Sequence, residues 1–178
     1  MEKSRNKKVV IIIAFKDFRD AEYFIPKEIL ERVGIKVETA SNKTGVAIGA
    51  DGGEINVDLL LSNINVADFD GVVFIGGPGC LKNLDNENSY NLIKEVVAQN
   101  KVLASICISP IILAKSGVLE GKKATVWSSK LEKKPVKILK KHRAIYRVAS
   151  VVVDGKIITA NGPLAAYKFG EAIVEALS

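Results

Sequence analysis

The residue of this chain best suited to covalent chemistry is Cys107. It follows an apolar, strand-like stretch at residues 101–106, and a helical pattern begins directly after it. A nucleophile at a sharp strand-to-helix turn is lifted clear of the sheet and lies near the first free N–H groups of the helix, which favour an anion. Such a thiol is expected to have a lowered pKa and to react at neutral pH. The alternative is a small core residue, because free cysteines are among the most buried residues.

Two other strand ends carry groups that could act on the same substrate. The apolar residues 72–75 lead into Gly76–Gly77, and the first predicted strand leads towards Glu22. Glycines at a strand end allow backbone N–H groups to point at a developing oxyanion, so Gly77 and Ile108 form a candidate pair of donors. Taken alone, Glu22 is an acidic residue near a helix start, where negative charge is favoured in any case.

The order of the predicted elements brings these strand ends together. Residues 9–14 are continuously apolar and mostly β-branched, as expected for a central parallel strand. Strands then alternate with helices, which predicts a parallel sheet with helices on both faces and ligands beyond the carboxyl ends of the strands. The expected strands are 9–14, 36–40, 72–75, 101–106 and 124–127; the expected helices are 25–33, 86–100, one after Cys107, 130–143 and 162–177; hairpins are expected within 41–56 and 144–160.

No internal repeat, low-complexity segment or domain boundary interrupts this pattern. We therefore expect residues 1–178 to form one flavodoxin-like three-layer α/β/α sandwich with a nucleophile elbow. No apolar stretch approaches the ~18–20 residues that a membrane span requires. Two cysteines give no disulfide framework, so a cytoplasmic location is expected. One histidine and two separated cysteines give no recognisable metal site, and no metal or cofactor is expected.

The net charge of +6 is concentrated between Lys130 and Arg143, where Glu132 is the single acidic residue. The lysines of this segment follow helical spacing and would form one stripe. A phosphate or nucleic-acid contact is one interpretation. A solvated helix face is the favoured one, because no aromatic residues interleave with the lysines. The only histidine, His142, lies in the same segment and is not expected to be catalytic.

The combination of these segments resembles the ThiJ/PfpI superfamily, and most closely its parkinsonism-associated protein deglycase branch. The resemblance extends from about residue 7 to the C-terminus. The matching segments are 20–22 ahead of 25–26, then 74–79, 105–110 and 154–163. It implies that Cys107 is the nucleophile, that Glu22 hydrogen-bonds the cysteine sulfur through a carboxyl of raised pKa, and that Gly77 and Ile108 supply oxyanion donors. Homodimers are common in the family, and one is expected here.

The chain departs from the family pattern at two positions. The protease-like branch has a histidine directly after the cysteine, where this chain has Ile108; the deglycase branch has a histidine on the next strand, close to the place of Trp127. A triad is therefore not expected, and peptidase activity loses its general base. Trp127, Asn161, Pro163 and Cys80 are candidate pocket residues. Trp127 could equally fill the core, and Cys80 is either an incidental thiol or a partner that resolves an oxidised Cys107.

The resemblance implies a cofactor-independent enzyme for small reactive carbonyls, of the glutathione-independent glyoxalase or deglycase type. The Cys107 thiolate would add to the aldehyde of methylglyoxal, Glu22 would move a proton between the two carbons, and hydrolysis of the thioester would release lactate. Two alternatives remain open. One is a redox sensor or stress-protective chaperone with little turnover, in which the thiol is oxidised to a sulfinate. The other is a structural member with a vestigial site.

Overall fold

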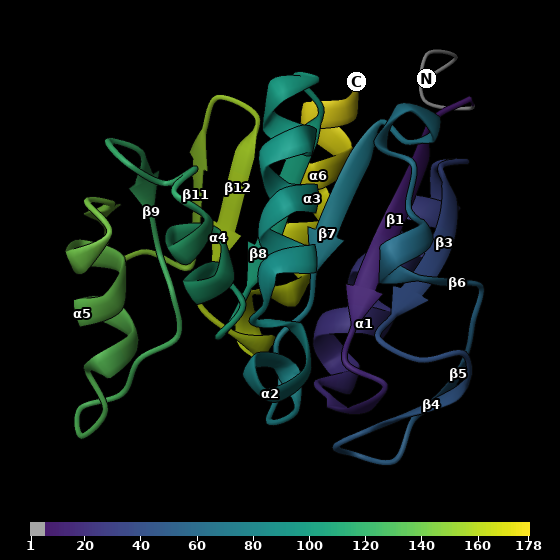
Figure 1. The fold of residues 1–178 in the computed structure, drawn as a ribbon, viewed down its shortest axis with the longest axis horizontal. Coiled ribbons are helices and arrows are strands. Elements are labelled where there is room, and N and C mark those ends of the chain that lie inside the picture. Colours follow the sequence, from purple (N-terminus) through teal and green to yellow (C-terminus); the bar gives the residue numbers. More distant parts are fainter. Residues whose placement is uncertain (1–5) are drawn as a thin grey trace.

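A seven-stranded sheet forms the middle layer of the fold in the computed structural model, which describes residues 6–178 (Figure 1). The strand order is β11-β12-β8-β7-β1-β3-β6, and β11 alone among these strands runs antiparallel to its neighbour. The bounds are Lys8–Ile13 (β1), Lys36–Ser41 (β3), Leu59–Leu60 (β6), Gly71–Phe74 (β7), Val102–Ile106 (β8), Val151–Asp154 (β11) and Ile157–Ala160 (β12).

Helices cover both faces of this sheet because its central strands are apolar on both sides. Along β1, Val9 and Ile11 pack into the core beneath α1 and α6, whereas Val10 and Ile12 pack into the opposite core beneath α3 and α4. In Figure 1, α3 and α4 lie in front of the sheet and α6 behind it. The helices are Asp20–Arg32 (α1), Cys80–Leu84 (α2), Glu87–Ala98 (α3), Pro110–Ser116 (α4), Lys134–Lys141 (α5) and Ala166–Leu177 (α6).

Two small sheets and three 3₁₀ turns complete the described fold. The strands β2, β4 and β5 form one sheet beside the carboxyl end of β1, and β9 pairs in parallel with β10. Their bounds are Lys16–Phe18 (β2), Gly45–Gly49 (β4), Glu54–Val57 (β5), Lys123–Ala124 (β9) and Ile145–Tyr146 (β10), and the 3₁₀ turns are Leu61–Asn63, Val66–Asp68 and Pro163–Ala165. None of the helices in the described range is long and apolar enough to cross a membrane.

The predicted three-layer fold with a mostly parallel sheet is confirmed, but four local predictions are wrong. The strand expected at 124–127 ends at Ala124, because Thr125 donates its N–H to the Thr159 side chain and Trp127 donates to the Cys107 carbonyl. The expected hairpin 144–160 is antiparallel only in its second half, since β10 pairs with β9. The helix expected at 25–33 begins earlier, at Asp20, so that Pro26 lies inside α1, beyond its first turn.

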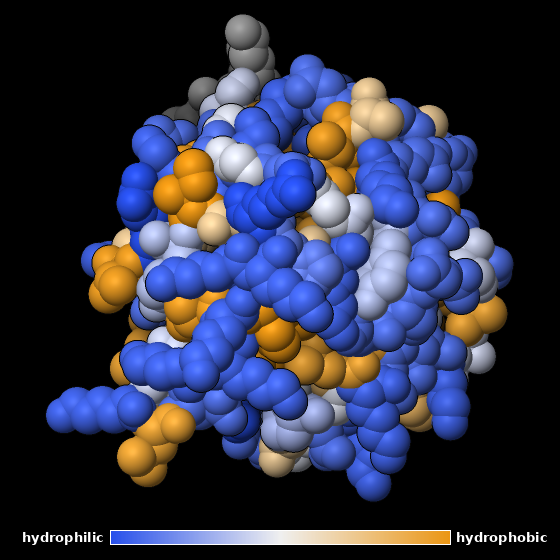
Figure 2. All heavy atoms as spheres, turned by 60° about the vertical axis from the view of Figure 1, so that its left-hand side comes forward, coloured by the Kyte–Doolittle hydropathy of each residue, from blue (hydrophilic) through white to orange (hydrophobic). Residues whose placement is uncertain are grey.

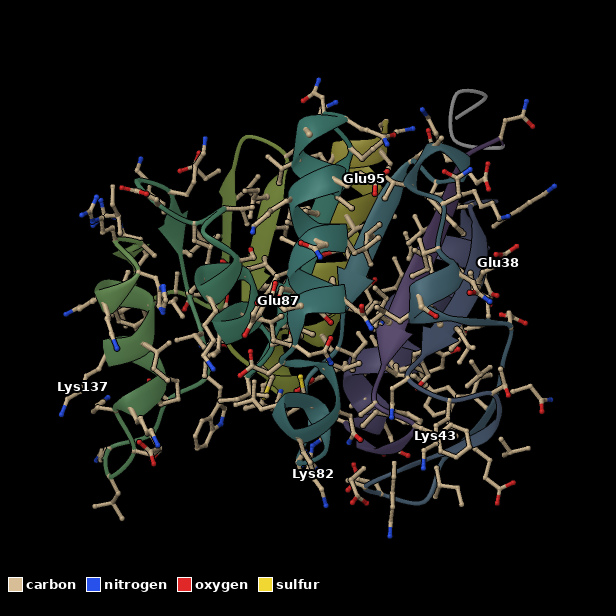
Figure 3. All side chains as sticks on the ribbon, in the orientation of Figure 1. Glu38, Lys43, Lys82, Glu87, Glu95 and Lys137 are labelled. Carbon is tan, nitrogen blue, oxygen red and sulfur yellow. The ribbon has the colours of Figure 1, made fainter. Side chains whose placement is uncertain are left out.

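The lysine-rich helix is the fourth correction. It begins at Lys134 rather than Lys130, because the Ser129 hydroxyl accepts the N–H groups of Leu131 and Glu132 and holds the preceding residues in a turn. The four lysines on α5 are exposed, and Lys137 points away from the molecule in Figure 3. Figure 2 brings this side forward and shows a largely hydrophilic surface with apolar residues visible between the charged side chains.

The turn between β8 and α4 is held together by one buried hydroxyl. Ser109 Oγ lies 2.9 Å from the Phe74 carbonyl oxygen and 2.8 Å from the Ile106 carbonyl oxygen, and it accepts the Ile106 N–H at 3.0 Å. It also lies 2.7 Å from Ser105 Oγ. This single side chain therefore ties β7, β8 and the start of α4 to one another just below Cys107.

Replacing this hydroxyl is expected to destabilise the fold. Ser109→Ala leaves several buried polar groups without a partner, so we expect the free energy of unfolding to fall by about 2–3 kcal/mol. Urea titration measures the change. Ser116→Ala is the matched control, because the buried Ser116 hydroxyl makes one hydrogen bond, to the Leu113 carbonyl. An equal loss in the two variants would contradict the bridging role of Ser109.

Candidate active site

Cys107 occupies a backbone conformation that few side chains adopt. Its φ is +65°, in the left-handed region. Its N–H donates to the Ala160 carbonyl at 2.9 Å, and its carbonyl accepts the Trp127 N–H at 2.8 Å. The backbone on both sides of the thiol is thus bonded to neighbouring segments, which maintains an unfavourable conformation. The residue is 9% exposed, so the thiol is reached only through an opening.

Glu22 lies in the first turn of α1 and is fully buried. Its Oε2 accepts the Gly76 N–H at 3.0 Å, whereas its buried Oε1 has no hydrogen-bond partner among the described residues. The carboxyl lies close enough to the Cys107 thiol for each group to shift the pKa of the other. Gly76 lies between the two side chains and has no side chain of its own. A Cβ at position 76 would lie 2.7 Å from the Cys107 Cβ and 2.8 Å from Glu22 Oε2. The contact between carboxyl and thiol therefore requires glycine at this position.

Burial sets the protonation of this pair. Desolvation raises the pKa of Glu22 from 4.5 to about 7, although the hydrogen bonds from Cys107 and Gly76 oppose the shift. Desolvation and the nearby Glu22 carboxylate also raise the pKa of Cys107 above its ordinary value, whereas hydrogen bonds from the Ile108 and Gly77 N–H groups lower it. The expectation of a lowered thiol pKa is therefore wrong, and desolvation is the main reason. Protonation of Glu22 removes the negative charge that raises the pKa of the thiol further.

The two N–H groups expected to bind an oxyanion lie beside the thiol. The backbone N–H groups of Gly77 and Ile108 lie close enough to the Cys107 sulfur to lower the pKa of the thiol. Gly77 has φ +111°, and a Cβ there would lie 2.4 Å from the Arg19 backbone nitrogen, so this loop also needs glycine. When a substrate carbon is bonded to the sulfur, the oxygen on that carbon lies close to the N–H groups that surround the sulfur. Their role as an oxyanion hole remains a prediction.

The thiol faces a pocket of about 360 Å³. Trp127 and Pro163, both predicted pocket residues, line it. Cys80 does not, because it is completely buried in the core on the α3 and α4 side of the sheet, which corrects its prediction as a pocket residue. Asn161 is exposed and is not among the lining residues. The lining consists of Arg19, Gly77, Pro78, Leu81, Cys107, Ile108, Trp127 and Pro163.

Sequence reasoning missed three of these residues, Arg19, Pro78 and Leu81. The position of Arg19 directly before the segment 20–22 was the one available signal. A second hollow, of about 210 Å³, shares Leu81, Ile108 and Trp127 with the pocket and continues to α5. His142 follows the last residue of α5 and lines neither hollow. Within residues 6–178, no group of three His, Cys, Asp or Glu side chains is arranged to hold a metal ion.

The raised pKa of Glu22 predicts an unusual dependence of stability on pH. The folded state keeps the Glu22 proton up to about pH 7, whereas the unfolded chain releases it near 4.5. The unfolded state thus binds fewer protons between these values, and the free energy of unfolding falls as pH rises through them. Urea titrations of the wild type and Glu22→Gln at about pH 5 and about pH 8 measure this contribution.

The difference between the wild type and Glu22→Gln is expected to change by up to about 3 kcal/mol over this range, in favour of the variant at high pH. Glu28→Gln, which alters an exposed carboxylate on the same helix, is the control and is expected to follow the wild type. A constant difference between the wild type and Glu22→Gln would contradict the raised pKa.

Proteins similar in sequence to this chain were found in several organisms. The chain is 40% identical to an uncharacterized protein of Methanocaldococcus jannaschii over 99% of this chain and 85% of that protein. It is 32% identical to a deglycase of Pyrococcus abyssi (94% and 98% covered) and 28% identical to a glutathione-independent glyoxalase of Caenorhabditis elegans (96% and 89% covered).

The fold and the sequence lead to the same family. The crystal structure of a ThiJ/PfpI domain protein from Brachyspira murdochii superposes with a TM-score of 0.90 at 34% identity, covering 96% of this chain and 95% of that one. The model of the DJ-1/PfpI family matches residues 7–176. This chain, with its buried glutamate against an elbow cysteine, belongs to the DJ-1/PfpI family.

Proposed function

We propose that this protein is a cofactor-independent cysteine enzyme that converts reactive α-oxoaldehydes such as methylglyoxal into hydroxy acids without glutathione. The observation that carries the proposal is the contact between the Cys107 thiol and a buried Glu22 whose pKa is about 7. A general acid or base works best when its pKa lies near the working pH. The relatives named as a deglycase and a glutathione-independent glyoxalase support the same substrate class.

The reaction begins when the Cys107 sulfur adds to the aldehyde carbon. The oxygen of that carbon becomes negatively charged, and the N–H groups of Gly77 and Ile108 stabilise it until it is protonated as a hemithioacetal. The Glu22 carboxylate then removes the proton from the former aldehyde carbon and returns it to the neighbouring carbon. The enediol between these steps becomes a thioester of a hydroxy acid.

Water hydrolyses the thioester, releases lactate and restores the thiol. Methylglyoxal plus one water equals lactic acid, so the reaction consumes no oxidant or reductant. One carboxyl that both accepts and donates a proton is sufficient, and no imidazole is required. Peptidase activity is not proposed, because a triad histidine is absent from the pocket lining.

Turnover is expected to depend on both members of the pair. Purified protein with methylglyoxal, and without glutathione or metal, is expected to form lactate. Cys107→Ser is expected to reduce the rate to background, and Glu22→Gln to lower kcat by at least about a hundredfold. Enzymatic quantification of lactate is the measurement.

Matched controls separate chemistry from folding. Cys80→Ala removes the other, fully buried thiol, and Glu28→Gln removes an exposed carboxylate on the same helix; both are expected to retain activity. Absence of lactate with the wild type, together with oxidation of Cys107 to a sulfinate by peroxide, would overturn the enzymatic proposal and favour the redox sensor.

The pH dependence of the reaction reports on Glu22. Because the carboxyl has a pKa of about 7, the fraction of the pair that has lost a proton falls about tenfold per pH unit below this value. We expect kcat/KM for methylglyoxal to fall in proportion to this fraction. Initial rates measured at pH values below and above the pKa of Glu22 test the effect. A profile that stays flat down to the ordinary carboxyl pKa would contradict the role of Glu22 as the base.

A further inference from the structure

Arg19 is the one charged residue among those that line the Cys107 pocket, and the reaction described above gives it no role. It is the residue before the first turn of α1, and its N–H donates to the Gly76 carbonyl at 3.1 Å. Its backbone therefore lies against the glycine loop that separates Glu22 from Cys107. Its positive charge lowers the pKa of Glu22, which places it within electrostatic reach of the reacting pair.

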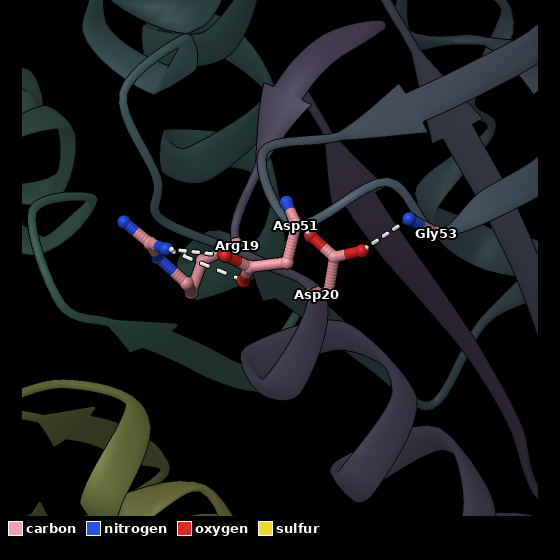
Figure 4. Close-up of polar contacts among 4 residues, drawn as sticks. All are labelled: Arg19, Asp20, Asp51 and Gly53. Atoms are coloured by element: carbon pink, nitrogen blue, oxygen red, sulfur yellow. Dashed lines mark hydrogen bonds and ion pairs between the residues drawn. The ribbon is translucent and has the colours of Figure 1, made fainter.

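The Arg19 side chain is held in place by a neighbouring loop (Figure 4). The Asp20 carboxylate accepts the N–H groups of Asp51 at 2.9 Å and of Gly53 at 2.6 Å. A Cβ at Gly53 would lie 2.4 Å from Asp20 Oδ1, so the loop approaches this closely only with glycine. The loop in turn presents the Asp51 carboxylate to Arg19.

Asp51 contacts only one nitrogen of the guanidinium. Arg19 Nη1 lies 3.2 Å from Asp51 Oδ1 and 3.3 Å from Oδ2. Within the described part of the chain, Nε and Nη2 have no hydrogen-bond acceptor. These two nitrogens form a flat edge that matches the two oxygens of a carboxylate. Figure 4 shows one guanidinium nitrogen pointing away from Asp51.

The rest of the pocket favours the same kind of ligand. Its walls are apolar or backbone, from Pro78, Leu81, Ile108 and Trp127, and its volume of about 360 Å³ admits a molecule of a few carbons. A single cation in such surroundings interacts with an anion more strongly than it would in water. The neutral methylglyoxal molecule carries no anion that could bind the Nε–Nη2 edge.

We propose that Arg19 is a specificity-determining residue that binds the carboxylate of the substrate, so that the preferred substrate is a small aldehyde or α-oxoaldehyde carrying a carboxylate. The assignment rests on the proposed carbonyl chemistry at Cys107 and names its substrate class. The carboxylate binds to the Nε–Nη2 edge while the aldehyde carbon meets the sulfur. Asp51 orients the guanidinium and keeps it from reaching Glu22.

The first experiment tests the anion preference without any turnover. Iodoacetate and iodoacetamide alkylate a thiolate by the same step, in which sulfur bonds to the CH₂ carbon and iodide leaves, but only iodoacetate carries a carboxylate. The rate ratio at Cys107 is measured by peptide mass spectrometry and normalised to the ratio for free cysteine. Cys80 does not interfere, because it is fully buried.

We expect Arg19→Gln to lower the iodoacetate-to-iodoacetamide ratio by about 3- to 30-fold, the range for one charge-assisted hydrogen-bonded pair at a partly exposed site. Arg19→Lys is expected to retain part of the preference, since it keeps the charge but not the flat edge. Arg143→Gln is the matched control: it removes an exposed arginine that is paired with Glu120, and is expected to keep the wild-type ratio. A ratio in Arg19→Gln within about twofold of the wild type overturns the proposal.

The second experiment compares turnover of methylglyoxal with that of 4,5-dioxopentanoate, an α-oxoaldehyde that carries a carboxylate and would yield 2-hydroxyglutarate. We expect the wild type to have the higher kcat/KM for the anionic compound. Arg19→Gln is expected to lower this preference by the same factor as the alkylation ratio. A merely structural role of Arg19 would change both substrates equally.

The two experiments separate the two proposals. An Arg19-dependent alkylation ratio without turnover of either aldehyde supports the anion site and contradicts the proposed enzyme reaction. Turnover of both aldehydes with the same preference in the wild type and Arg19→Gln supports the enzyme and overturns the anion site.

Discussion

The close approach of the Glu22 carboxyl to the Cys107 thiol is the constraint on which the site depends. A buried carboxyl is costly unless it is hydrogen-bonded, and here the Gly76 N–H bonds Oε2 while Oε1 has no partner among the described residues. The approach requires three separate features: a positive φ at Cys107, the absence of a side chain at Gly76, and an α1 that begins where β1 and β2 end. The Ser109 hydroxyl then holds β7 and the elbow at a constant distance.

This arrangement also explains why the thiol is not simply an activated cysteine. Burial raises the pKa of both groups, and that of the thiol lies well above that of Glu22, so Glu22 loses its proton first and the remaining proton is on the thiol. The backbone N–H groups of Gly77 and Ile108 favour the form in which sulfur is the anion. Reactivity is therefore set by the transfer of that proton, and a substrate that displaces water from the pocket changes it further.

The pocket differs from a triad site in its polarity. Trp127 and Ile108, which stand at or near positions where the resemblance leads us to expect histidine, both line the pocket. Apolar walls at these two positions remove an alternative base and leave Glu22 as the proton carrier. They also make Arg19 the dominant fixed charge facing a ligand, although Asp51 partly neutralises it. The two proposals thus assign proton transfer and substrate selection to the two ends of the same short segment, residues 19–22.

Local sequence patterns determined much of the fold. Short, largely apolar runs predicted β1, β7 and β8, since such runs are buried on both faces of a parallel sheet. The elbow at Cys107 was predictable from local sequence as well, because an apolar strand pattern ends at this cysteine and a helical pattern begins directly after it. Local patterns were least reliable after residue 116, where Thr125 and Trp127 bond to distant groups instead of forming a strand. The strand propensity of a residue carries no information about hydrogen-bond partners that are distant in the chain.

The amino-acid sequence by itself determined which residues carry chemistry and that the strand ends of a parallel sheet would gather them. Only the tertiary structure decided the pKa values of these residues and which other residues lie beside them in the site. Burial of Cys107 and of Glu22 raised the pKa of each group, where the helix start alone suggested a lowered thiol pKa, and the core removed Cys80 from the site. The loop anchored by Asp20 turned Arg19 into a wall of the pocket. These outcomes depend on contacts between residues far apart in the chain, which no local pattern encodes.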